Sequence, residues 1–350
     1  MCPLLTCDIE YFMERRHFIS IFGGLGLGLL IPGAIYRYLM HGTNIGDAGV
    51  RLYLKDGAQA ALRAITPNDD FYQMTSRDEP VVDTKTWSFR IDGLVKNPLH
   101  FSYEELRALP PYETTLTLEC ISNPVGGRDI GNAVWKGTLL KPLIGRAGVL
   151  PEAKYAVFYA AEGYTSGHPL ERFHDPANFL AYDMNGEPLP RAHGFPLRVL
   201  MPGRYGMKMP KWLTRIEFVD KEYLGYWERQ GWSNVGDRHT QAVVDDPHNT
   251  AKISGPSFVI TGYAIGGKSG ISKVEISIDG NEWQEVEIFS NPMPSQMWAF
   301  WKFVWRNPSK GDHAVKVRAT DGGGNLQTSL ERPEWPEGAT GYHSIDVTVV

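Results

Sequence analysis

The sequence predicts an α+β fold with two unlike domains, a mixed domain followed by an all-β sandwich. A chain of 350 residues is long enough for two domains. Over residues 67–236, strand patterns alternate with short helix signals, whereas residues 251–350 hold short strand patterns separated by turn residues. Such spacing over about 100 residues is typical of an Ig-like sandwich.

The composition describes an ordinary soluble protein surface. The formal net charge is -5, and 21% of the residues are charged. The sequence has no basic excess that would indicate nucleic-acid binding, and its acidic residues form no tail. With 37 glycines and 24 prolines, the chain favours turns and strands over long helices.

Residues 1–40 are predicted to be an export signal or a membrane anchor. Arg15 and Arg16 are adjacent, and Phe18 and an apolar, glycine-rich stretch over 20–35 follow them. This order is typical of twin-arginine export signals. The stretch is too short and too rich in glycine to be a convincing spanning helix, which needs about 20 apolar residues. We therefore expect export to the periplasm, with anchoring by an uncleaved signal as the alternative.

The mixed domain is expected over 67–236, after a polar lead-in over 41–66 that holds one short helix near 56–65. The run 86–93 alternates along its length and closes in a turn, which predicts a first strand. Further runs of strand character lie over 114–120, 154–161 and 195–201.

A short helix is predicted to begin at Ser102. Glu105 stands at the capping-box spacing, and Pro110 stops the helix. The strand over 114–120 follows. Because side chains alternate across a strand, Cys120 is expected at its end and on its apolar face.

The C-terminal domain over 251–350 is predicted to be all-β, and a polar linker over 237–250 precedes it. Asp279 and Gly280 mark a hairpin turn. The region lacks the Cys pair of true Ig domains. Its runs of strand character lie over 257–264, 273–278, 283–288, 298–305, 314–319 and 345–350.

Cys120 is the single cysteine of the main body. The other two, Cys2 and Cys7, precede any predicted domain, and they also precede Met13, a candidate translation start in place of Met1. The predicted domains therefore hold one thiol and no partner for an intramolecular disulfide.

On the residues alone, the Cys120 thiol has three interpretations. It is an inert buried side chain, a nucleophile paired with His168, His174 or His193, or a metal ligand. One thiolate without Cys or His at ligand spacing makes a poor zinc or iron–sulfur site. A soft metal would therefore take its other ligands from a cofactor.

The segment over 181–213 is similar to the molybdopterin-binding region of the sulfite oxidase family. The match is long and near-continuous, and it includes His193, Arg198 and Lys211. The resemblance extends from roughly residue 67 to the end of the chain. It implies a sulfite-oxidase-type molybdopterin domain, followed by an Ig-like dimerisation domain and hence a homodimer.

By this resemblance, Cys120 is the protein thiolate on molybdenum, and the pterin dithiolene supplies two further sulfurs. His193 and Arg198 align with family residues that hold the phosphate and pterin of the cofactor. An anionic phosphate suits the fork-shaped donor of Arg. The other residues implied to contact the cofactor are Phe71, Tyr72, Met209, Pro210 and Lys211.

The resemblance also implies oxygen-atom transfer at a sulfur centre. Sulfite oxidases place arginines where this chain has Met74 and Val125, and an active-site tyrosine where it has Trp232. A dianion needs charge-assisted donors, which argues against sulfite as the substrate. Arginines on other loops that could compensate are Arg77, Arg128 and Arg204. Because the sequence holds no Cys-x-x-Cys-His haem motif, a separate cytochrome or membrane component is expected to exchange the electrons.

Three alternatives remain open. Periplasmic methionine-sulfoxide reductases share the Phe71-Tyr72 segment and the cysteine, but they usually lack the sandwich. A cysteine hydrolase would use Cys120 with His193. A non-enzymatic exported binding module would have a degenerate cofactor site. Such a site would have no reason to keep the complete set of His193, Arg198 and Lys211, which this chain has.

Overall fold

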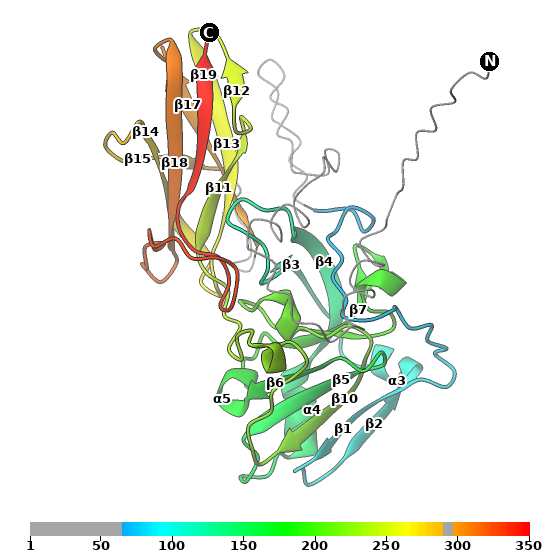
Figure 1. The fold of residues 1–350 in the computed structure, drawn as a ribbon. Helices are drawn as coiled ribbons and strands as arrows, with labels where there is room; N and C mark the ends of the chain where they lie inside the picture. Colours follow the sequence, from blue (N-terminus) through cyan, green and yellow to red (C-terminus); the bar gives the residue numbers. More distant parts are fainter. Residues whose placement is uncertain (1–64, 290–296) are drawn as a thin grey trace, which may run out of the picture.

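The computed structural model describes residues 65–289 and 297–350, which form two domains (Figure 1). The predicted export signal and nearly all of the lead-in, with its helix near 56–65, lie outside the described residues. Within the described part, none of the helices is both long enough and apolar enough to cross a membrane. The predicted fold class, a mixed domain followed by a β-sandwich, is confirmed.

One sheet of the first domain has the strand order β2-β1-β10-β5-β6. The β1 and β10 strands run parallel, and the other neighbours are antiparallel. Its strands are β1 (Ser88–Gly93), β2 (Leu99–Ser102), β5 (Tyr155–Ala160), β6 (Thr165–Pro169) and β10 (Leu213–Val219).

A second sheet has the order β3-β4-β7-β8, and β9 pairs with β7. Its strands are β3 (Tyr112–Glu119), β4 (Ile130–Leu139), β7 (Phe179–Met184), β8 (Glu187–Pro188) and β9 (Arg198–Leu200). The helical elements are α3 (Tyr103–Arg107), α4 (Leu140–Ala147), α5 (Leu170–Phe173) and the 3₁₀ turns η1 (Arg191–His193), η2 (Gly206–Lys208) and η3 (Glu228–Gln230). One apolar core joins both sheets and α4, with Phe158, Trp135 and Leu140 fully buried in it.

The predicted helix start is confirmed at α3. The Glu105 amide donates to the Ser102 hydroxyl over 3.2 Å, and the Ser102 amide donates to the Glu105 carboxylate over 2.8 Å. This reciprocal pair satisfies two backbone donors that the first turn leaves without helical partners.

The second domain is a sandwich of two sheets. One has the order β11-β13-β17-β16, and the other has the order β12-β19-β18-β14-β15. The strands are β11 (Gln241–Asp246), β12 (Ala251–Ile253), β13 (Ser257–Ile265), β14 (Ile271–Ile278), β15 (Gln284–Glu285), β16 (Glu287–Ile288), β17 (Ala299–Arg306), β18 (Gly311–Asp321) and β19 (His343–Val349). Ile260 and Trp301 of one sheet pack with Val274 and Val317 of the other, so inward-facing apolar residues form the core.

Three predicted boundaries need correction. The linker over 237–250 contains β11, which pairs with β13, so the sandwich begins earlier than predicted. The run 283–288 is not one strand, because the chain crosses between the two sheets at the buried residue Val286. The strand over 195–201 is reduced to Arg198–Leu200, the part that pairs with β7.

Contacts between the domains fix the end of β3. The buried guanidinium of Arg238 donates to the carbonyls of Thr117 and Gly266, which belong to different domains. The Thr117 hydroxyl accepts the backbone N–H of Trp298 over 2.9 Å. The strand that leads to Cys120 is therefore held from both domains.

Candidate active site

Cys120 directly follows β3, as the alternation predicts, and its side chain is 7% exposed. Its N–H donates to the carbonyl of Asp129 over 2.9 Å, and its carbonyl accepts the N–H of Asn123 over 3.1 Å. The Ser122 hydroxyl oxygen lies 3.1 Å from the Cys120 sulfur. The thiol is thus held at the start of a tight turn.

The surroundings of Cys120 do not suit a free nucleophile. Burial raises the pKa of the Cys120 thiol to about 11, and the hydrogen bond from Ser122 only partly opposes this effect. Nucleophilic cysteines need a lowered pKa or an adjacent base. His168 and His193 instead bond the carbonyls of Lys208 and Asn68. The Cys120 sulfur has the Ser122 hydroxyl as its hydrogen-bond partner, and the bonds of His168 and His193 are made to other groups, which does not favour the hydrolase interpretation.

Phe71 and Tyr72 form an aromatic wall with two residues from other elements. The Phe71 ring centroid lies 5.4 Å from Tyr72, 5.8 Å from Trp135 and 5.5 Å from His193. Tyr72 also lies near the end of β3, because a Cβ on Gly206 would meet both the Tyr72 hydroxyl and the carbonyl oxygen of Glu119, the residue before Cys120. The structure therefore brings the predicted Phe-Tyr segment, His193 and Cys120 into one region.

Arg198 is a buried cation at the base of this region. Its side chain is 5% exposed, its guanidinium carbon lies 5.1 Å from the Trp135 ring centroid, and Nη1 donates to the His193 carbonyl over 3.1 Å. Its Nε has no hydrogen-bond partner among the described residues. Burial lowers the pKa of Arg198 to about 10, so it stays charged at neutral pH. A buried cation with an unused donor suits an anionic ligand.

The segment of Met209, Pro210 and Lys211 lies beside the same elements. The Met209 N–H donates to Gly206, the Pro210 carbonyl accepts from Val199 over 3.2 Å, and Lys211 Nζ donates to Ala192 over 2.8 Å. These bonds hold the segment against β9 and η1.

Gly206 links this segment to the thiol. A Cβ on Gly206 would lie 2.7 Å from the Tyr72 hydroxyl and 3.5 Å from the Glu119 carbonyl oxygen. The backbone of η2 therefore approaches both Tyr72 and the end of β3, and a side chain at position 206 would displace the Tyr72 hydroxyl.

Sequence reasoning missed a buried ion pair next to these residues. Lys208 Nζ and Glu228 Oε1 are 2.6 Å apart, and both side chains are fully buried. Lys208 also donates to the carbonyl of Gly167, and the Ser166 hydroxyl donates to Glu228 over 2.8 Å. No local sequence pattern predicts this pair, because Lys208 and Glu228 are 20 residues apart and come into contact only through the tertiary structure.

Trp232 lies in an apolar cluster next to Cys120. Trp227 and Trp232 are partly buried and pack against the buried residues Ile121, Tyr205 and Met207. At the position where the resemblance implies a tyrosine, this chain therefore has Trp232, which packs against the cluster that contains Ile121, the residue after Cys120.

The candidate compensating arginines have different surroundings. Arg204 is engaged, because it pairs with Asp237 at 2.6 Å and donates to the Val235 carbonyl at 2.8 Å. Arg77 lies beside Gly163. Arg204 therefore binds the loop that joins the two domains, through Asp237 and Val235.

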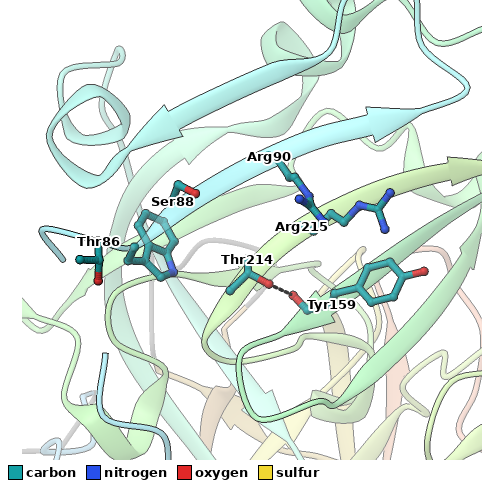
Figure 2. A pocket seen from close by; sticks show the side chains of 7 residues that line it. Thr86, Ser88, Arg90, Tyr159, Thr214 and Arg215 are labelled. Atoms are coloured by element: carbon teal, nitrogen blue, oxygen red, sulfur yellow. Dashed lines mark hydrogen bonds between the residues drawn. The ribbon is translucent and has the colours of Figure 1, made fainter. Parts of the chain in front are cut away.

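A separate depression of about 400 Å³ opens between β1, β5 and β10 (Figure 2). It is lined by Thr86, Trp87, Ser88, Arg90, Tyr159, Thr214 and Arg215. Asp92 pairs with both arginines, at 3.2 and 2.7 Å. None of the predicted site residues lines it, so it is distinct from the region around Cys120.

The site residues fit a molybdopterin cofactor. In the described part of the chain, no three His, Cys, Asp or Glu side chains are grouped to hold a metal ion by themselves. Cys120 offers one thiolate, Arg198 offers a buried cation with an unused donor, and Gly206 leaves room for close backbone approach. One protein thiolate and an anion-binding pocket suit a cofactor that brings its own metal ligands and carries a phosphate.

Comparisons with known proteins identify two domain families in this chain. The family description "Oxidoreductase molybdopterin binding domain" matches residues 76–227, and "Mo-co oxidoreductase dimerisation domain" matches residues 234–337. The second match begins before 241, in agreement with the placement of β11 in the sandwich.

Individual relatives support the same assignment. The uncharacterized oxidoreductase YuiH of Bacillus subtilis is 36% identical over 49% of this chain and 88% of its own length. Mitochondrial sulfite oxidase of Rattus norvegicus is 29% identical over 82% of this chain, which spans only 62% of that enzyme. In fold, the chain resembles the crystal structure of the sulfane dehydrogenase SoxCD from Paracoccus pantotrophus, with a TM-score of 0.70, 23% identity and 80% of each chain covered.

Proposed function

Because this chain belongs to the sulfite oxidase family of molybdopterin-dependent oxidoreductases, we propose that it transfers an oxygen atom at a sulfur centre and exchanges electrons with a separate protein. Oxidation of a sulfur centre in this way takes the oxygen from water and releases two protons and two electrons. When bound, the molybdenum cofactor supplies the redox chemistry, and the protein supplies binding, orientation and charge.

The observation that carries the proposal is the buried Cys120 thiol at the end of β3, in the same domain as the buried Arg198, whose Nε has no hydrogen-bond partner among the described residues. The thiol is aimed by three bonds of its own turn. Arg198 and Lys211 supply positive charge for the phosphate end of the cofactor, and the neutral ring of His193 packs against Phe71. Catalysis would need all of these groups in one rigid arrangement, which two sheets and the second domain provide.

The substrate is proposed to be less anionic than sulfite. Met74 and Val125 stand where the family places arginines, and Arg204 is already paired with Asp237. The cluster that contains Trp227 and Trp232 offers an apolar face next to the thiol. A thioether, or another sulfur centre with an apolar substituent, fits such a face better than a dianion does.

The reverse reaction, reduction of an S-oxide, is the second candidate. The same apolar face favours it, since a sulfoxide is neutral and carries apolar groups. In this direction the separate partner delivers the electrons and water leaves with the oxygen atom. Turnover assays with methionine sulfoxide and a reduced dye, beside methionine or sulfite with ferricyanide, distinguish the two directions.

Elemental mass spectrometry of the purified full chain tests the proposal. About one molybdenum per polypeptide, from a host that makes the cofactor, is the expected result. A ratio near zero from such a host would contradict it. The variant Cys120→Ser should lose turnover while its circular dichroism spectrum stays unchanged, and full activity in that variant would also contradict it.

We also propose export and dimerisation. The twin arginine at Arg15 and Arg16 supports export of the folded, cofactor-loaded protein to the periplasm. The match of residues 234–337 to a dimerisation domain supports a homodimer. Cell fractionation tests the first proposal, and light scattering tests the second.

A further inference from the structure

A buried carboxyl group stands directly before Cys120. It belongs to Glu119, the last residue of β3, whose side chain is fully buried. Its Oε1 accepts one hydrogen bond from Nδ2 of Asn123 over 3.0 Å and another from Nε2 of Gln241. Its Oε2 has no hydrogen-bond partner among the described residues. A single oxygen atom therefore accepts both bonds.

Gln241 reaches Glu119 from the second domain. It is the first residue of β11, where it pairs with Ile265 of β13, and its side chain is only 4% exposed. Because the donor and the acceptor are both buried, water does not compete for this hydrogen bond. The bond therefore joins the frame of the sandwich to the residue before Cys120.

The hydrogen bonds continue from Glu119 into the turn after β3. Asn123 donates to Glu119 with Nδ2, and its Oδ1 accepts the N–H of Asp129 over 3.0 Å. The Asp129 carbonyl accepts the N–H of Cys120 over 2.9 Å, and the Cys120 carbonyl accepts the N–H of Asn123 over 3.1 Å. An unbroken path of hydrogen bonds thus connects Gln241 of the second domain with the backbone of Cys120.

Two further strands of the sandwich reach the same turn. The Tyr263 hydroxyl of β13 donates to the Gly127 carbonyl over 3.4 Å. A Cβ on Gly126 would lie 2.3 Å from Nε2 of His343 in β19. The turn that follows Cys120 therefore lies against the second domain, so a path from that domain to the thiol is short.

We propose that Gln241, in the second domain, is a positioning residue that sets the orientation of the Cys120 thiol in the first. It acts through the buried side chains of Glu119 and Asn123. This inference rests on the proposed function, in which Cys120 is the protein thiolate on molybdenum. Hydrogen bonds behind a metal ligand orient that ligand and hold it rigid. The second domain, whose family match describes dimerisation, then also shapes the metal site.

The test replaces Gln241 with Met, which has a similar size but no hydrogen-bond donor, in the full-length protein. Hydrogen–deuterium exchange followed by mass spectrometry reports on the peptide that carries Cys120. Gln241→Met should speed amide exchange in that peptide about tenfold, the value of one buried hydrogen bond. The electron paramagnetic resonance spectrum of the reduced, molybdenum-loaded protein should change as well, because the thiolate takes another orientation.

The matched control is Lys268→Met, which removes another contact of the same kind between the domains. Lys268 lies between β13 and β14, and its Nζ donates to the carboxylate of Asp175 in the first domain. Asp175 lies between α5 and β7, outside the turn that follows β3. The control should therefore change neither the exchange at Cys120 nor the spectrum.

A second variant tests whether the bonds act as one path. Asn123→Ala interrupts the path inside the first domain and should by itself speed exchange at Cys120. In that background Gln241→Met should have no further effect, because the link to the turn is already broken. Additive effects of the two substitutions would overturn the inference, since Gln241 would then act by another route.

Two other outcomes would also overturn it. Unchanged exchange and an unchanged spectrum in Gln241→Met would show that this side chain does not position Cys120. An equal effect of Lys268→Met would assign the change to general loosening between the domains. Molybdenum per polypeptide in the unaltered protein reports on the proposed function separately, because exchange at Cys120 is measurable with or without the metal.

Discussion

The hydroxyl of Ser122, which follows Cys120 by two residues, lies 3.1 Å from the Cys120 sulfur. A hydroxyl at this distance donates a hydrogen bond to a thiolate and withdraws electron density from it. Hydrogen bonds to ligand sulfurs are one of the means by which proteins tune the potential of a bound metal.

Under the proposed ligation of molybdenum by Cys120, removing this hydroxyl should change the potential of the metal without emptying the site. We expect Ser122→Ala to lower the reduction potential by tens of millivolts, because the thiolate becomes a stronger donor. Potentiometric titration followed by electron paramagnetic resonance measures the shift. Ser122→Thr keeps the hydroxyl and should retain the original potential, and equal potentials in all three proteins would show that the bond does not reach the metal.

Arg198 provides a second test, directed at cofactor retention. Replacing its buried guanidinium with the neutral Gln should weaken cofactor binding about tenfold to a hundredfold, the value of one charge-assisted hydrogen bond. Pterin fluorescence after oxidation, together with molybdenum per polypeptide, gives the readout. Arg198→Lys keeps the charge but loses the fork-shaped donor, so it should retain an intermediate amount. Full cofactor content in Arg198→Gln would show that this cation does not contact the cofactor.

The buried pair of Lys208 and Glu228 predicts a loss of stability. Glu228→Gln leaves the ammonium buried without its counter-charge, which costs about 3 to 5 kcal/mol when a buried pair is broken. Urea unfolding should show the loss. The double variant Lys208→Met/Glu228→Leu removes both charges and should regain much of the stability. If the double variant is less stable than the single one, the pair itself stabilises the fold.

The sequence predicts those features of the fold and the site that local patterns determine. Alternation places Cys120 at a strand end, the capping box of Ser102 and Glu105 starts α3, and turn residues divide the sandwich into strands. These features depend on neighbours within a few residues. Only the resemblance to a family predicts that His193 and Arg198 cluster with Phe71, because more than a hundred residues separate Phe71 from the other two.

The features that the sequence did not predict depend on tertiary contacts. The strand β11 lies in a polar stretch, and only its pairing with β13 makes it a strand. The run 283–288 has strand character throughout, yet Val286 is buried between the sheets and divides it. The sequence also does not predict the contact between Ser122 and Cys120, since a serine two residues after a cysteine need not contact it. The turn after β3 brings the two side chains together.

His343 predicts a pH dependence of stability at the domain boundary. Its Nδ1 accepts the N–H of Val244 over 3.1 Å, and its ring fills the space beside Gly126, in the turn that follows Cys120. Burial lowers the pKa of His343 from 6.5 to about 4, so the folded protein holds the ring neutral. Protonation would remove the acceptor and place a charge between the domains.

The sign of the effect follows from proton binding. Between pH 6.5 and pH 4 the unfolded chain binds a proton at this position and the folded chain does not, so stability is full above pH 6.5 and is lost as the pH falls. The loss reaches about 3.5 kcal/mol at most, since the pKa falls from 6.5 to about 4 and one unit of pKa corresponds to about 1.4 kcal/mol. His343→Gln keeps an acceptor for Val244 and cannot titrate, so its free energy of unfolding should fall less between pH 7 and pH 4.5. Urea unfolding at several pH values measures both proteins, and parallel curves would show that His343 does not contribute, because every other titrating group is common to the two.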